Sequence, residues 1–349
     1  MSYKVSLIVP VYNAENSIEK LIKSIINQSI GFENIELIIV NDKSTDNTEN
    51  IVKKYSDKYE NVKLFTLSEN SGAPGRPRNV GIENATADYI IFSDADDVYL
   101  ENAFERYYEV IKSEGSDFVM GSHYWDLGTN DLIKINILHD EEDINNPNND
   151  IVNINPWESQ RSFNKLAYNH VSPWGKIFKK ETILKNNVRF LDKYACEETF
   201  FYFSTLKYSS KVTLLPNDQL YIYVTDDNSS SFIHSHDIKK FNSFLNGFSH
   251  VYDVIKTFPF DINIPLTDNI GYLLLFFSNV EKKSKKEAAL KLYEFEKSID
   301  REITLPRKEL DVLNKLILKK HFSLAIKLSD FYSFLYANNT IKKLYRTRR

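Results

Sequence analysis

The stretch SENSGAPGRPRNVGIENATADYIIFSDADD, from Ser68 to Asp97, combines the features that set the expected fold and site. A loop rich in glycine, proline and arginine leads into a short helix and then into an apolar strand that ends in acids, among them Asp94 and Asp96. Carboxylates at the end of a buried strand are costly to desolvate unless a positive group lies between them. A metal ion that carries a phosphorylated substrate would account for these acids and for Arg76 and Arg78 upstream.

Strands and helices alternate outward from this stretch. Apolar, β-branched runs at residues 3–13, 35–42 and 61–70 predict strands, and the first of these is expected to end at Pro10. An apolar stripe at residues 14–29 predicts an amphipathic helix. This order predicts an α/β fold with a doubly wound, mostly parallel sheet, whose ligands bind at the carboxyl ends of the strands. The residues at those ends are Pro10, Tyr12, Asp42, Asn70, Asp94 and Asp96.

The composition excludes several classes of protein. The 349 residues include 44 Lys and Arg against 48 Asp and Glu, a formal net charge of -4, so binding of nucleic acid by bulk electrostatics is not expected. The single cysteine, Cys196, excludes an intramolecular disulfide framework and fits a reducing compartment. The N-terminus lacks the apolar run of a signal peptide, and the run at residues 270–280 is too short for a bilayer, which needs ~20 apolar residues. We therefore expect a cytoplasmic location.

Asp94 and Asp96 are candidate metal ligands. Alternation along the strand sends both side chains to one face. There they can approach Mg²⁺ or Mn²⁺ that also binds phosphate oxygens. The alternative is a solvated turn, because Asp-rich turns are common. The position after a buried strand of a parallel sheet favours the metal site.

The arginine loop and a pair of glutamates also have two interpretations each. The guanidinium groups of Arg76 and Arg78 suit phosphate oxygens, although residues 70–79 could form a strained surface loop. Glu197 and Glu198 begin a predicted helix, where they either interact with the helix dipole or provide a general base. The chain has neither G-x-x-x-x-G-K-[ST] in the loop nor G-x-G-x-x-G after the first strand, so a P-loop NTPase and a dinucleotide dehydrogenase fit poorly.

Five motifs together resemble a known family. SLIVPVYNAENSIEKLIKSIINQ, IIVNDKSTDNT, NSGAPGRPRNVGI, DYIIFSDADD and CEETFF occur in the order and spacing of inverting, family 2 nucleotide-sugar glycosyltransferases with the GT-A fold. The resemblance covers about residues 1–235. The NSGAPGRPRN loop, the SP before KIF and the helical C-terminal extension look more narrowly like the wall teichoic acid poly(ribitol phosphate) N-acetylglucosaminyltransferases of Gram-positive bacteria.

The resemblance implies a nucleotide-sugar site at the strand ends. The residues that it assigns to the donor are Pro10, Tyr12, Asp42, Asn70, Arg76, Arg78 and Asp94. The first three would hold the uracil base, and the next three would line the nucleotide and the diphosphate. Asp94 would contact the ribose or the donor sugar.

The resemblance also implies a metal ligand and a catalytic base. Asp96 would bind Mn²⁺ or Mg²⁺, and Glu198, the second acid of the family's acid pair, would deprotonate the acceptor hydroxyl. The pair here is Glu-Glu, whereas Glu-Asp is commoner in the family. A further metal ligand is expected near Asn228, with His234 and His236 farther along the chain.

Helical periodicity dominates after about residue 237, so we expect a GT-A catalytic domain at residues 1–236 and an α-helical region at residues 237–349. The apolar stripe that includes Leu273, Leu274, Phe276 and Phe277 exceeds what a small helical unit needs for its own core. This excess predicts a homo-oligomer, with a trimer as one candidate. The basic tail at residues 341–349 is expected to be solvated, and contact with anionic lipid or polymer is the alternative. Any contact of the protein with the membrane is therefore expected to be peripheral, at its inner face.

Three functions are compatible with these motifs. The first is metal-dependent, inverting transfer of a sugar, with N-acetylglucosamine as the expected sugar, from a UDP-sugar to poly(ribitol phosphate) wall teichoic acid. The second is transfer to a lipid-linked capsule or exopolysaccharide repeat unit, because the donor motifs do not define the acceptor. The third is a catalytically degenerate module that binds nucleotide sugars. The first two differ in the acceptor, and the third lacks turnover.

Overall fold

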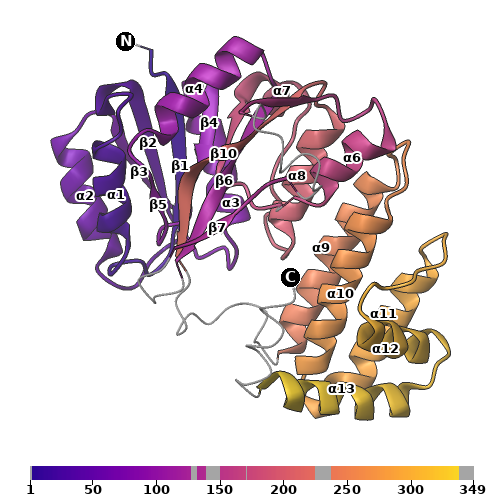
Figure 1. Ribbon diagram of the computed structural model, residues 1–349. Helices are drawn as coiled ribbons and strands as arrows, with labels where there is room; N and C mark the ends of the chain where they lie inside the picture. Colours follow the sequence, from indigo (N-terminus) through magenta and orange to yellow (C-terminus); the bar gives the residue numbers. More distant parts are fainter. Residues whose placement is uncertain (1, 127–131, 139–149, 170, 225–236, 338–349) are drawn as a thin grey trace. The chain divides into compact units, whose positions relative to one another are not determined.

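A computed structural model describes residues 2–126, 132–138, 150–169, 171–224 and 237–337 of the chain. Contacts divide the chain into two compact units (Figure 1). The first unit contains Met1–Asp227 and Phe258–Phe260, and the second contains Asn228–Thr257 and Asp261–Arg349. The boundary that we predicted after residue 236 follows a segment outside the described residues, so it stays a prediction.

The first unit is built around one sheet. Its strands are β1 Val5–Val11, β2 Ile35–Asn41, β3 Val62–Thr66, β4 Tyr89–Phe92, β5 Val98–Tyr99, β6 Phe118–Asp126, β7 Leu132–Ile135, β8 Val152–Ile154, β9 Lys176–Lys179 and β10 Val212–Val224. Their order is β3-β2-β1-β4-β9-β6-β10-β5, with β7 on β6 and β8 on β10. The first four strands pair in parallel, as predicted. Antiparallel pairs enter with β9, β7, β8 and β5, so the sheet is mixed.

Helices lie on both faces of this sheet (Figure 1). In the first unit they are α1 Ile18–Ile26, α2 Thr48–Lys58, α3 Gly75–Asn84, α4 Ala103–Glu114, α6 Gln160–Ala167, α7 Lys180–Lys185 and α8 Glu197–Lys207, with a 3₁₀ turn η1 at Phe32–Asn34. The predicted stripe of α1 is confirmed, because Ile18, Leu21, Ile22 and Ile25 are buried in one core with alternate residues of β1 and β2. On the opposite face, a Cβ at Gly81 of α3 would lie 2.2 Å from Ile8 Cγ2, so this close approach requires glycine.

β1 continues one residue beyond Pro10, so the expected end of this strand at the proline is wrong. Pro10 pairs with Val40 of β2. On the other side, β4 ends at Phe92, opposite Ile8, whose carbonyl accepts from Ser93 N at 3.1 Å. Pro10 therefore faces the side where β4 has ended, and its missing N–H removes no bond from the sheet.

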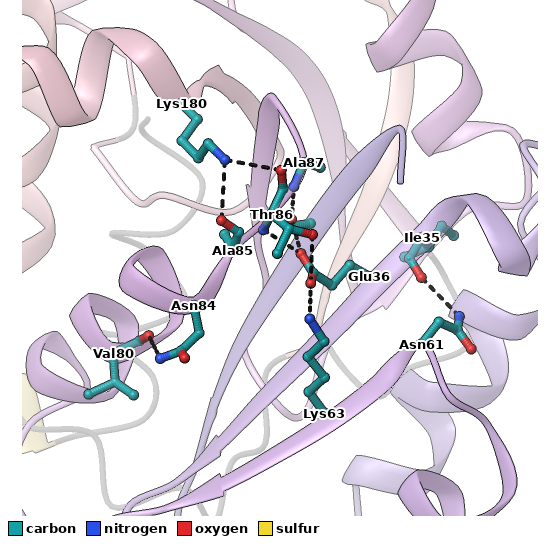
Figure 2. Close-up of polar contacts among 11 residues, drawn as sticks. Ile35, Glu36, Asn61, Lys63, Val80, Asn84, Ala85, Thr86, Ala87 and Lys180 are labelled. Carbon is teal, nitrogen blue, oxygen red and sulfur yellow. Dashed lines mark hydrogen bonds and ion pairs between the residues drawn. The ribbon is translucent and has the colours of Figure 1, made fainter. Parts of the chain in front are cut away.

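The buried Glu36 of β2 connects residues at the amino-terminal edge of the sheet (Figure 2). Its partners are Ser6 of β1, Lys63 of β3 and Thr86 in the segment before β4. Its side chain is fully buried, and its carboxylate accepts from Ser6 Oγ at 2.5 Å, Thr86 N at 2.7 Å, Thr86 Oγ1 at 2.9 Å and Lys63 Nζ. Burial alone would raise the pKa of Glu36, but the hydrogen bonds from Lys63, Ser6 and Thr86 outweigh burial and lower it. The carboxylate is thus satisfied and ionised.

The second unit is helical, as predicted. Its helices are α9 Ile238–Ile255, α10 Asn263–Asn279, α11 Lys285–Lys297, α12 Lys308–Leu318 and α13 Phe322–Ala337, with a 3₁₀ turn η3 at Lys282–Ser284. Among the described residues, no helix is long and apolar enough to cross a membrane.

The apolar stripe of α10 does not provide a free surface. Leu273, Leu274, Phe276 and Phe277 are each at most 1% exposed. The premise that these residues exceed the needs of the chain's own core is therefore wrong, because the single chain already buries them. The stripe therefore does not support the predicted homo-oligomer, whose interface would have to be formed by other residues.

Candidate active site

The acids Asp94 and Asp96 lie in a turn. β4 ends at Phe92, and residues 93–97 lead through this turn to β5. The expectation that strand alternation places both carboxylates on one face is therefore wrong, because the turn sets their directions. The Asp94 side chain is 31% exposed, and Asp96 is exposed.

Arg78 connects three of the sequence motifs. It lies in the first turn of α3, which begins at Gly75, and its side chain is only 1% exposed. Its guanidinium forms ion pairs with Asp94 (Nη2–Oδ1, 2.7 Å), Glu198 (Nη2–Oε1, 2.9 Å) and Glu197 (Nη1–Oε1, 3.4 Å). The group that the resemblance assigns to the diphosphate is thus directed at carboxylates.

Two features of the backbone allow Arg78 of α3 to approach the two glutamates of α8. A Cβ at Gly75 would lie 2.0 Å from the carbonyl oxygen of Leu191, so only glycine lets the start of α3 approach the segment before α8. α8 begins directly after Cys196, whose φ of 66° is in the left-handed region that non-glycine residues rarely adopt. This turn presents Glu197 and Glu198 side by side to Arg78.

Negative charge exceeds positive charge in this cluster. Burial would lower the pKa of Arg78, but Glu198, Asp94 and Glu197 outweigh burial and raise it. Burial and the neighbouring Glu198 raise the pKa of Glu197 to about 7, against the opposing effect of Arg78. Burial also raises the pKa of Glu198, Arg78 opposes the rise and Asp94 adds to it. The Glu198 side chain is 26% exposed and that of Glu197 11%, so Glu198 is the more accessible acid.

Asp97 is a structural acid that the sequence did not separate from its neighbours. It is fully buried, and its carboxylate accepts from the Tyr221 hydroxyl and from Val224 N (2.8 Å) in β10. Burial, followed by the charges of Asp94 and Asp96, raises its pKa to about 9. Asp97 therefore anchors the acid turn to β10.

Asp42 and Asn70 are in contact, as their positions at neighbouring strand ends suggested. The Asp42 carboxylate accepts from Ser71 N at 2.8 Å and Ser71 Oγ at 2.9 Å, and its carbonyl accepts from Asn70 Nδ2 at 2.9 Å. Asp42 is 5% exposed and holds the loop after β3 in place. Ser71 could not be identified from the sequence, because a serine in a loop is common and marks no particular function.

Tyr12 and Arg76 have accessible side chains, as do the exposed Asn70 and Asp96 of the predicted set. Tyr12 follows β1 and is 51% exposed, and the next residue, Asn13, accepts on Oδ1 from Thr45 N of the neighbouring loop at 2.8 Å. The Arg76 side chain is 40% exposed and has a long ion pair of 3.4 Å with Glu69. These two side chains are accessible to a ligand, whereas Pro10 is buried.

Lys176 of β9 is a buried lysine that the sequence analysis did not identify. It is fully buried, its Nζ donates to the Ser172 carbonyl at 2.6 Å, and burial lowers its pKa well below the ordinary value, against the opposing charge of Glu198. The Ser172 hydroxyl donates to Glu198 and lowers the pKa of that acid. Lys176 thus holds the loop that supports Glu198.

The acid turn has the chemistry for a hard divalent cation. Asp94 and Asp96 offer carboxylate oxygens, and Mg²⁺ binds through one or two carboxylates with substrate phosphates and water completing its shell. Among the described residues, no group of three or more His, Cys, Asp or Glu side chains is arranged to hold a metal ion. Asn228, His234 and His236 lie outside the described residues.

Comparison with known proteins finds a matching family profile and several similar proteins. The profile of glycosyl transferase family 2 matches residues 6–182. The chain is 42% identical over 118 residues to a poly(ribitol-phosphate) beta-glucosyltransferase of Bacillus spizizenii, a match that covers 34% of this chain and 19% of that protein. It is 32% identical over 231 residues to the poly(ribitol-phosphate) beta-N-acetylglucosaminyltransferase TarP of Staphylococcus aureus, covering 65% of each. The chain thus spans only a fifth of the first relative's length and less than two thirds of the second's.

A solved structure resembles both parts of the chain. The crystal structure of S. aureus TarS 1–349 in complex with UDP-GlcNAc aligns with a TM-score of 0.68 at 19% identity, covering 94% of this chain and 91% of that one. At this identity the likeness establishes the fold alone. The predicted GT-A fold with a helical C-terminal region is confirmed.

Proposed function

Because the chain belongs to glycosyl transferase family 2, we propose that it transfers a sugar from a UDP-sugar to a hydroxyl of a cell-surface polymer. The observation that carries this proposal is the convergence of Asp94, Glu197 and Glu198 on Arg78 at the carboxyl ends of the parallel strands. Ligands of open α/β sheets bind at this edge. Three acids around one buried cation are more than charge balance requires, which is typical of a site that binds a further cation or moves a proton.

The donor would lie across the ends of β1, β2 and β3. Tyr12 is exposed and could stack on the uracil base, with Pro10 beneath it and Asp42 and Asn70 shaping the adjoining loop. Arg76 would neutralise the diphosphate, because its guanidinium is accessible and only weakly paired. Arg78 would have a further role, because it pairs with Asp94, Glu197 and Glu198 and would hold these acids in position beside the donor. N-acetylglucosamine is the sugar that the resemblance favours.

Glu198 would be the general base. It would accept the proton of the acceptor hydroxyl while the acceptor oxygen forms a bond to the anomeric carbon of the donor sugar. The bond from that carbon to the diphosphate breaks on the opposite face, so UDP leaves with the electron pair and the configuration inverts. Glu197 is less exposed and would remain on Arg78, where it keeps the guanidinium in place.

Asp96, with Asp94 beside it, would hold Mn²⁺ or Mg²⁺ together with the donor diphosphate. A divalent ion in this position supplies charge neutralisation for the departing UDP. Asp96 is exposed, and its carboxylate oxygens are of the type that these ions prefer.

Relatives suggest the acceptor class. Two of them are described as poly(ribitol-phosphate) glycosyltransferases, and we propose the same polymer, wall teichoic acid, as the first candidate acceptor. A lipid-linked saccharide repeat unit is the second candidate, because the residues described above would contact only the donor and the reacting hydroxyl and so do not define the rest of the acceptor. The site of action would be the cytoplasmic side of the membrane, where such a donor is available.

A homo-oligomer remains part of the proposal, with α13 as its surface. Leu324 and Phe331 lie seven residues apart on one face of this helix and are 55% and 54% exposed. Light scattering of the full chain should give a mass above that of a monomer at micromolar concentration, and Phe331→Asp should return it to the monomer. A monomer before mutation would contradict this part.

The reaction is tested by release of UDP. Full-length protein is incubated with a panel of UDP-sugars, with Mn²⁺ or EDTA, and with poly(ribitol phosphate) or a lipid-linked saccharide. We expect UDP release that depends on the acceptor and on Mn²⁺. Binding of a UDP-sugar without turnover on any acceptor would instead support the degenerate binding module.

A further inference from the structure

An aromatic surface beside the acids has no role in the reaction above. Trp125 of β6 is 37% exposed and pairs with Tyr223 of β10, with ring centroids 6.5 Å apart. Ile133 of β7, 43% exposed, pairs with Trp125 on its other side. Cross-strand partners point to the same face of a sheet, so Trp125, Tyr223 and Ile133 form one apolar surface, which we call the aromatic strip.

A buried tryptophan, Trp174, packs against the aromatic strip. Trp174 stacks on Tyr223 with centroids 5.2 Å apart and planes 15° apart, and on Tyr221 at 4.7 Å and 10°. Tyr221 in turn donates its hydroxyl to Asp97 of the acid turn. The strip is therefore held in a defined position relative to Asp94 and Asp96, which is what a binding surface requires.

The surroundings of the strip are negative. Burial, then the charges of Asp97, Asp94, Asp96 and Glu198, raise the pKa of Tyr223 to about 12. Carboxylates accept hydrogen bonds from hydroxyl groups. A flat apolar surface bordered by acceptors fits a neutral sugar ring, which has a C–H face and donating hydroxyls.

The strand order places the strip on the acceptor side. The candidate donor residues follow β1, β2 and β3, and the acids follow β4, whereas the strip lies on β6, β7 and β10 beyond β9. In an inverting reaction the acceptor attacks from the face opposite to the leaving UDP. The surface on the far side of the acids from the nucleotide is therefore the acceptor side.

We propose that the aromatic strip binds a neutral pyranose ring of the acceptor, next to the hydroxyl that reacts. The C–H face of the ring packs on Trp125 and Tyr223, and its hydroxyls donate to the neighbouring acids. The inference rests on the proposed function, and it adds that the acceptor, whether poly(ribitol phosphate) or a lipid-linked saccharide, presents a sugar ring beside the hydroxyl that reacts.

The test compares Trp125→Ala, Trp125→Phe and a control, Tyr208→Ala, which removes an aromatic side chain that is 46% exposed at the far end of α8. Initial rates are measured with a saccharide-terminated acceptor and with sugar-free poly(ribitol phosphate). Trp125→Ala should raise the KM for the saccharide about tenfold, the loss expected for one stacking contact. Trp125→Phe should recover most of this loss, and Tyr208→Ala should leave the KM unchanged.

Calorimetry with UDP separates the two sides of the site. Trp125→Ala should bind UDP with the affinity of the unaltered chain, and its unfolding midpoint reports whether the fold is intact. The proposal is overturned if the KM for the saccharide is unchanged, or if the KM for the UDP-sugar rises instead, which would place the donor on the strip. Failure of the proposed function is a different result, namely no UDP release by the unaltered protein. In that event, saturation-transfer NMR with the saccharide still tests the strip, since Trp125→Ala should weaken the signal and Tyr208→Ala should leave it unchanged.

Discussion

The two edges of the sheet each bury a charged side chain, and they differ in how that charge is balanced. At the amino-terminal edge, the Glu36 carboxylate has one cation, Lys63, and neutral donors from Ser6 and Thr86 (Figure 2). At the carboxyl-terminal edge, the Arg78 guanidinium has three carboxylates. The charge at the amino-terminal edge is balanced by its hydrogen-bond and ion-pair partners, whereas the carboxyl-terminal edge holds an excess of negative charge.

This difference separates a structural network from a candidate active site. Hydrogen bonds to a buried carboxylate lower its pKa and stabilise the ionised form, as at Glu36. Burial, followed by the like charge of Glu198 on the same partner, raises the pKa of Glu197 to about 7, a value that allows proton exchange near neutral pH. Burial of charge is common to both edges, so the balance of charge carries the functional information.

The largest effect is expected at Asp96. If the excess of carboxylates binds a divalent cation with the donor diphosphate, Asp96→Ala should abolish the Mn²⁺-dependent part of UDP binding measured by calorimetry. Asp88→Ala removes an exposed acid before the start of β4, at the balanced edge, and should leave UDP binding unchanged. Full Mn²⁺-dependent affinity in Asp96→Ala would contradict the assignment of the metal site.

The next effect concerns the catalytic base. Glu198→Gln should lower kcat by ~10²–10⁴-fold with little change in UDP-sugar affinity, because a general base contributes about this factor. Glu198→Asp should keep measurable turnover. Glu197→Gln is the matched control on the adjacent residue, with the same loss of one charge beside Arg78. An inactive Glu197→Gln with a fully active Glu198→Gln would reverse the two roles.

Removal of the cation should affect the two edges unequally. Arg78→Met leaves buried carboxylates without their partner and should lower the free energy of unfolding by about 3 kcal/mol. Lys63→Met should cost less, about 1 kcal/mol, because the Lys63 side chain is 33% exposed and Ser6 and Thr86 still donate to Glu36. Urea unfolding of both variants measures the difference. Equal losses would mean that the excess charge at the carboxyl-terminal edge has no energetic consequence.

The last prediction is that the buried acids at the two edges, Glu36 and Asp97, make the free energy of unfolding depend on pH in opposite directions. The pKa of Glu36 is lowered on folding, so its stabilisation is present above its ordinary value of 4.5 and is lost as pH falls through the folded value. The pKa of Asp97 is raised to about 9, so its contribution is present below its ordinary value of 3.8 and is lost as pH rises toward 9. Glu36→Gln should flatten the acid side of a profile of unfolding free energy against pH by about 1 kcal/mol. Asp97→Asn should remove the fall in unfolding free energy between pH 3.8 and about 9. Unchanged slopes in either variant would contradict the corresponding pKa direction.

Local patterns in the sequence were sufficient for much of the fold. The stripe of α1 and the apolar runs of the first four strands depend on the spacing of neighbouring residues, and both were predicted correctly. The end of β1 was misplaced because the tolerance of Pro10 depends on where β4 stops, a property of a strand some 80 residues away. The antiparallel strands after Asp97 were not predicted either, because pairing direction is decided by the connections between strands.

The candidate site divides in the same way. The sequence by itself determined which residues reach the carboxyl-terminal edge, because the end of each predicted strand is a local property, and Asp42, Asn70 and Asp94 are found there. Only the tertiary structure decided the partners of Arg78, since Asp94 is 16 positions away and Glu197 119. It also decided that Asp97 anchors the acid turn and that Trp125 and Tyr223 share a face. These contacts depend on strand order and register, which are set by packing of the whole sheet and leave no signal in any short stretch of residues.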